Sequence, residues 1–195
     1  MHKLNKQTGA TLIEILVSIL VISFGILAMA AVQSNSVRFH KTTEYRATAT
    51  LLAADLADRM RANNAGTSAN QYEWPTTAYT PLTEDDIGDA VTCGESVING
   101  VLSTPCTANT MAAKDLWEWK RRLSLMLPGA SGHITAYDAT RRAVDMWIAW
   151  QDPSETDSSG TSTAVSSAEC PSSTAVGIWT ASTPAPHCLF LRVAL

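Results

Sequence analysis

The stretch TGATLIEILVSILVISFGILAMAAV (Thr8–Val32) decides how this chain is built. It is an almost unbroken apolar run, and Glu14, near its start, is the one charged residue within it. A membrane-spanning helix needs about 20 apolar residues, whereas the apolar segment of a secretory signal peptide has about 7–15. The run therefore favours a membrane helix over a signal peptide. A charge in such a helix is unfavourable, by about 2.5–3.5 kcal/mol at the helix centre, so the presence of Glu14 near the start calls for an explanation.

The periodicity of the following residues extends this helix beyond the membrane. No proline occurs in residues 10–74, and the chain turns polar after Val32. From Arg46 onwards, the apolar residues follow the 3.6-residue spacing of a helix with one buried face. These residues are Ala49, Leu52, Ala53, Leu56 and Met60. We expect one helix over residues 11–63, whose part in 10–32 is apolar all round and whose part in 33–63 is amphipathic.

Residues 64–195 have the composition of a globular head. After a polar loop over 64–110, the sequence MAAKDLWEWKRRLSLML (111–127) predicts a helix that PGASG terminates. The apolar residues expected on its inner face are Leu116, Trp119, Leu123 and Met126.

Three strand patterns complete the head. They cover residues 133–137, 142–150 and 187–195, and the first two flank a turn at 138–141. A Ser/Thr-rich loop over 153–177 separates the last two. The strands predict a small antiparallel sheet that packs on the amphipathic half of the long helix, which is an α+β fold.

The chain has four cysteines, and none of them lies in the apolar segment. An even number in an exported chain favours disulfides, and three pairings are possible. We favour the local pairing, because it requires the fewest long-range assumptions. It joins Cys93 to Cys106 and Cys170 to Cys188. The spacings contain no C-x-x-C, so a zinc site is disfavoured.

No pattern in the sequence predicts a catalytic site, a metal or a cofactor. There is no G-x-S-x-G, no pair of histidines at i,i+4 and no glycine-rich phosphate loop. The acidic clusters, Glu84–Asp86 and Asp152/Glu155/Asp157, are typical of solvated loops. With a net charge of −4 and no block of Lys and Arg, we expect neither an enzyme nor a nucleic-acid-binding protein.

The N-terminus resembles the prepilin cleavage motif of the type IV pilin family. A basic leader, residues 1–9, ends in Gly9, and TLIE (Thr11–Glu14) and the apolar run follow in order. The resemblance implies that the prepilin peptidase cuts between Gly9 and Ala10. It also implies that Ala10 becomes an N-methylated N-terminus and that Glu14 is the signature carboxylate at the fifth mature position.

This resemblance gives Glu14 a physical role. In the inner membrane its carboxylate lies near the interface, where snorkelling and water relieve the charge. Among the apolar helices of a filament it would be buried, and removal of one partner of a buried pair costs about 3–5 kcal/mol. By resemblance, the partner is the free amine of Ala10 in a neighbouring subunit.

Further motifs resemble the minor pilins of the PilV kind, the type IV pilus modification proteins. They are Arg46, Ala54–Leu56, RMRAN (Arg59–Asn63) and WIAWQD (Trp147–Asp152), followed by a cysteine-bearing final strand. The resemblance implies a single-pass inner-membrane protein with a periplasmic head. It then joins the pilus, near its tip, with other minor pilins, the major pilin and an adhesin as partners.

Two alternatives stay open at this point. A pseudopilin of a type II secretion system shares the N-terminal motif and has no adhesive role. A membrane-anchored periplasmic binding module or enzyme would use residues 64–195 and keep its leader.

Overall fold

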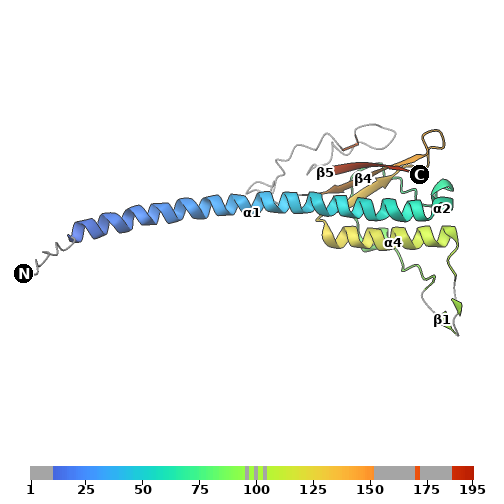
Figure 1. Cartoon of the computed structure of the whole chain (residues 1–195), viewed down its shortest axis with the longest axis horizontal. Coiled ribbons are helices and arrows are strands. Elements are labelled where there is room, and N and C mark those ends of the chain that lie inside the picture. The colour runs from blue at the N-terminus through green and yellow to red at the C-terminus, as the bar shows by residue number, and fades with distance from the viewer. Residues whose placement is uncertain (1–10, 95–96, 99–100, 103–104, 152–169, 172–185) are drawn as a thin grey trace, which may run out of the picture. The chain divides into compact units, whose positions relative to one another are not determined.

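The computed structural model describes residues 11–94, 97–98, 101–102, 105–151, 170–171 and 186–195 (Figure 1). The chain divides into two compact units, residues 1–41 and residues 42–195. The long helix α1 (Leu12–Ala62) begins in the first unit and ends in the second. Its observed limits lie within one residue of the expected 11–63. The stretch 33–43, where the apolar pattern is weakest, is helical as well.

The second unit consists of short helices and strands that surround the end of α1. They are α2 (Asn64–Ser68), α3 (Glu84–Ile87), β1 (Val97–Ile98), β2 (Val101–Leu102), α4 (Ala108–Met126), β3 (Ser131–Ile134), β4 (Ala143–Trp150) and β5 (His187–Ala194). Strands β3, β4 and β5 form an antiparallel sheet in that order, and β1 pairs with β2. The expected α+β fold, a long N-terminal helix with a small antiparallel sheet, is therefore confirmed.

The core of residues 42–195 lies between α1, α4 and the sheet. In Figure 1, α4 and the β4–β5 pair lie on opposite sides of the second half of α1. All five apolar positions expected on the buried face of α1 are buried, and Leu56 and Met60 are fully inaccessible. Trp119 of α4 is also fully buried, and its indole N–H donates to the carbonyl of Leu52 over 2.8 Å. The amphipathic pattern thus identified the half of α1 that carries the head.

The loop expected over 64–110 contains the short helices α2 and α3, the β1–β2 pair and the first turn of α4, none of which the sequence pattern predicted. Asn63 caps α2, since its side-chain oxygen accepts from the N–H of Gly66. Thr83 and Asp86 form a capping box at α3, and hydrogen bonds from Thr83 hold the pKa of Asp86 below its usual range. Both helices are too short for a 3.6-residue apolar pattern to develop.

The limits of α4 and β3 and one expected core residue were wrong. Helix α4 covers 108–126 instead of 111–127. Strand β3 covers residues 131–134 instead of 133–137, because the N–H of Asp145 donates to the side-chain hydroxyl of Thr135 and the ladder ends there. On the other edge of β3, Trp74 exchanges backbone hydrogen bonds with Ile134. In α4, Met126 is 52% exposed, and it is Leu127 that is buried.

The structure contains the disulfides Cys93–Cys106 and Cys170–Cys188, the local pairing favoured from the sequence. Cys170 and Cys188 are buried against Tyr79 and Ala149. Most of the Ser/Thr-rich loop 153–177 lies outside the described residues; Cys170 and Pro171 are its only described positions.

Candidate functional site

The N-terminal half of α1 carries an apolar surface, from Leu12 to Val32, that none of the described residues covers. Every side chain described between Leu12 and Lys41 is exposed. Phe24 and Leu27, for example, are 65% and 66% exposed. Among the described residues, α1 is the one helix that is long and apolar enough to cross a membrane. Since soluble proteins rarely leave so large an apolar area uncovered, this surface suits contact with lipid or with other helices.

The polar groups within the apolar run are arranged to suit such surroundings. Ser18 donates its hydroxyl to the carbonyl of Glu14, and Ser23 donates to that of Ile19, each over 2.7 Å. Both hydroxyls are therefore satisfied within the helix, as an apolar environment demands. Glu14 lies in the first turn, where a negative charge interacts favourably with the helix dipole. In the described part of the chain, its carboxylate has no ion-pair partner.

The predicted processing site also includes the two residues that flank the cleaved bond. Gly9 and Ala10 lie outside the described residues, so cleavage after Gly9, methylation of Ala10 and its pairing with Glu14 stay predictions. The structure does show that the helix begins at Leu12 and that the backbone N–H of Glu14 already donates to the carbonyl of Thr11.

A polar network joins the end of α1 to α4. Arg59 donates to Asp115 over 3.0 Å and to Glu118 over 2.9 Å, and it also pairs with Asp55 one turn earlier. Burial disfavours the charged guanidinium, but these hydrogen bonds more than offset that effect, so the pKa of Arg59 is raised. Tyr72 completes the network through its hydroxyl, which donates to Asp115.

This network is structural in character. Burial and the hydrogen bond to Asp115 raise the pKa of Tyr72, so its hydroxyl stays protonated and acts as a donor. Asn63 donates to the Tyr72 hydroxyl over 3.3 Å and to the carbonyl of Ala108 at the start of α4 over 2.7 Å. Arg59 and Asn63 are the ends of the RMRAN stretch, which therefore fixes α4 on α1.

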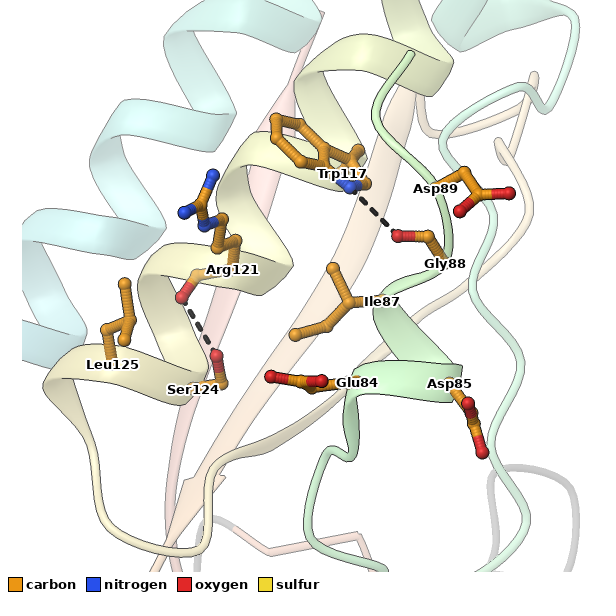
Figure 2. Close-up of a pocket in the computed structure, with 9 residues that line it drawn as sticks. All are labelled: Glu84, Asp85, Ile87, Gly88, Asp89, Trp117, Arg121, Ser124 and Leu125. Carbon is orange, nitrogen blue, oxygen red and sulfur yellow. Dashed lines mark hydrogen bonds between the residues drawn. The ribbon is translucent and has the colours of Figure 1, made fainter.

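A groove of about 670 Å³ lies between α3 and α4 on the surface of the head (Figure 2). The indole N–H of Trp117 donates to the carbonyl of Gly88 over 3.1 Å and closes one end. Ile87 and Leu125 supply apolar surface, and Figure 2 shows the guanidinium of Arg121 between Trp117 and Leu125. Three carboxylates line the α3 side: Glu84, Asp85 and Asp89.

The remaining candidate ligands are not brought together. His40 is exposed, His133 is buried and His187 is half-buried. Among the described residues, no group of three or more His, Cys, Asp or Glu side chains has an arrangement that could hold a metal ion. The second acidic cluster, Asp152, Glu155 and Asp157, lies outside those residues.

The fold and the uncovered helix suit a protein of the membrane-anchored or filament-forming class, in which lipid or other helices enclose the first unit. Comparison with known families agrees with that class. Residues 31–117 match the Tt1218-like family, described as type IV pilin Tt1218. The match covers less than half of the chain, and it supports a type IV pilin-like protein. No curated protein and no solved structure matches the chain.

Proposed function

We propose that this chain is a minor type IV pilin of the PilV kind, a non-catalytic subunit of a filament. The observation that carries the proposal is the division of α1 into two halves. Apolar side chains around Glu14 are uncovered in the first half, whereas one apolar face of the second half is buried in the head. Such a helix suits storage in a bilayer and later packing among similar helices, because its apolar surface is enclosed in both states.

Two separate regions of the sequence support the same class. The prepilin-like motif ends at Glu14, and the similarity to the type IV pilin family begins at residue 31. Neither signal depends on the other, since they share no residue. The finer assignment to the PilV kind rests on the RMRAN stretch and on the WIAWQD segment.

In the proposed mechanism, the prepilin peptidase cuts after Gly9 and releases the amine of Ala10, which is then methylated. The chain waits in the inner membrane with its head in the periplasm. On assembly, Glu14 pairs with the Ala10 amine of a neighbouring subunit, so that neither charge is stranded among apolar helices. The subunit then helps to start the pilus in a tip complex with other minor pilins, the major pilin and an adhesin.

N-terminal sequencing and intact mass spectrometry of the chain from sheared filaments test this proposal. We expect a chain that begins at Ala10 and carries one added methyl group. A chain that retains residues 1–9 and stays in the membrane fraction would contradict the pilin assignment and favour an anchored periplasmic module.

A type II pseudopilin is the second candidate, because it shares the N-terminal motif. The family match names a type IV pilin, which favours the pilus. Affinity purification of the full chain separates the two. Other pilins co-purify with a minor pilin, whereas components of the secretion gate co-purify with a pseudopilin.

A further inference from the structure

The two disulfides of the head differ in how far their cysteines are covered. Cys170 and Cys188 are 6% and 0% exposed, and both are buried against the sheet. Cys93 is 4% exposed, whereas its partner Cys106 is only half-buried. In thiol–disulfide exchange a thiolate must reach one of the two bonded sulfurs, so access decides which bridge can react. Of the four cysteines, Cys106 is the one that the folded head leaves accessible.

The surroundings of Cys106 provide this access. Cys106 lines a groove of about 360 Å³, the α1–α4 groove, together with residues from the end of α1 and the start of α4. Gly94 also lies next to its sulfur, since a Cβ atom at this position would lie 3.3 Å from Sγ of Cys106. With φ at +71°, residue 94 has a conformation that favours glycine, so no side chain covers the sulfur from this side. The groove is large enough to admit a small thiol.

The charges around the bridge favour the first step of its reduction. A thiolate attacks Sγ of Cys106 and forms a new S–S bond with it, while the Cys93–Cys106 bond breaks and its electron pair leaves with the sulfur of Cys93. The ammonium of Lys114 donates to the carbonyl of Cys93 over 3.0 Å. A cation therefore lies beside the residue that becomes a thiolate, which stabilises the leaving group.

The second step is favoured by the position of Cys106 in the chain. Another thiolate attacks the reagent's own sulfur in the mixed disulfide, so the two reagent molecules end as a disulfide and Cys106 leaves as a thiolate. Cys106 directly precedes Thr107, the N-cap of α4, and a helix N-terminus stabilises a thiolate. Two electrons pass from the two reagent thiols to the bridge, and the protons that these thiols lose end on the two cysteines.

The core of the head does not depend on this bridge. Asn63 donates to the carbonyl of Ala108 over 2.7 Å and Arg59 donates to Asp115 over 3.0 Å, so α4 stays attached to α1 without it. The strands between the two cysteines, β1 and β2, form a sheet of their own, separate from β3, β4 and β5. Opening of the bridge therefore leaves the contacts between α1, α4 and the large sheet in place.

We propose that Cys93–Cys106 is an exchangeable disulfide and that Cys106 is the site at which a low-molecular-weight thiol modifies the folded head. Cys170–Cys188 is its protected counterpart, because its sulfurs become accessible only when the head unfolds. The inference does not rest on the proposed function, since it uses only contacts within the head.

Timed exposure of the full chain in detergent to 2-mercaptoethanol tests the proposal. The reaction is quenched with iodoacetamide at intervals, and each cysteine is assigned by mass spectrometry of peptides. At early times we expect a mercaptoethanol adduct on Cys106 and an alkylated Cys93. Reaction at this bridge should be at least about tenfold faster than at Cys170 and Cys188.

A core variant separates local access from unfolding. Leu56→Ala weakens the core, so it should speed the reaction of Cys170 and Cys188 by at least about tenfold and leave that of Cys106 unchanged. Leu20→Ala, on the exposed half of α1, is the matched control and should change neither rate. Urea below the midpoint of unfolding should give the same separation in the wild-type chain, which covers the case that Leu56→Ala does not fold.

Three results would overturn the proposal. They are equal rates for the two bridges, a mercaptoethanol adduct mainly on Cys93, and a rate at Cys106 that rises with urea or with Leu56→Ala as steeply as that at Cys188.

Discussion

The two halves of α1 are one continuous helix with opposite relations to the rest of the chain. From Leu12 to Lys41 every described side chain is exposed, whereas Leu56 and Met60 in the second half are fully buried. Backbone hydrogen bonding is helical in both, so the difference comes from the side chains alone. The side chains of the first half point outward and are available to lipid or to other subunits. The second half is part of the head.

Paired leucine substitutions test this comparison with the largest expected effect. Leu56→Ala should lower the free energy of unfolding of the head by about 2–5 kcal/mol, because it leaves a cavity in the core. Leu20→Ala, on the exposed half, should leave it unchanged. Tryptophan fluorescence of the full chain in detergent during denaturation reports on the head, since all six tryptophans lie in residues 42–195. Equal effects of the two substitutions would contradict the division of the helix.

The Arg59 network should contribute almost as much to the free energy of unfolding of the head as Leu56 does. Arg59→Ala strands the carboxylates of Asp115 and Glu118, and we expect a loss of about 2–4 kcal/mol in the same measurement. Arg61→Ala is the matched control, because Arg61 pairs with Asp58 over 2.9 Å and donates to the carbonyl of Ala194 over 3.2 Å, both on an exposed face. Exposed pairs contribute about 0–1 kcal/mol, so the control should change little. A loss from Arg61→Ala as large as that from Arg59→Ala would show that the network has no special role.

Loss of a disulfide should give the next-largest fall in the free energy of unfolding. The serine double variant of Cys170 and Cys188 removes a bridge that spans 18 residues and is buried against the sheet, and about 2–3 kcal/mol should be lost. The double variant of Cys93 and Cys106 should lose less, because Cys106 is only half-buried and the bridge spans 13 residues. Chemical denaturation with and without each bridge measures the two losses of stability. A larger loss from the Cys93/Cys106 variant would contradict this prediction.

A pH titration gives the smallest expected effect. Burial lowers the pKa of His133 below its ordinary value of 6.5 in the folded head. Between the folded and unfolded pKa values the unfolded chain binds the additional proton, so stability falls as the pH is lowered below about 6.5. His133→Gln should flatten this dependence, as measured by denaturation from pH 7 downwards. An unchanged slope would mean that another group titrates.

The long helix and its buried face could be predicted from the sequence because a local pattern determines them. The 3.6-residue spacing of Ala49, Leu52 and Leu56 predicts which face of the helix is buried. The same pattern misplaced one residue at the end of α4. Leu127 follows the last helical residue with extended backbone, at φ −122° and ψ 127°, and its side chain is buried although helical spacing assigned that place to Met126.

The contacts that assemble the head could not be predicted in this way. The Asp55–Arg59 pair is local, but the partners Asp115 and Glu118 are 56 and 59 positions from Arg59. Nothing in the sequence near Arg59 specifies them. The groove could not be predicted for the same reason, because α3 and α4 are separated in the sequence and come together only in the fold. The cleavage residues Gly9 and Ala10 are the opposite case. A linear sequence motif predicts their role, although they lie outside the described residues.

Glu14 provides the most direct test of the central claim, which is that the first half of α1 assembles and the second half folds. Glu14→Gln removes the charge and keeps the size of the side chain. We predict an unchanged free energy of unfolding of the head, together with at least about a tenfold fall in the amount of chain recovered in sheared filaments. Incorporation of Glu14→Gln at the wild-type level would contradict the account.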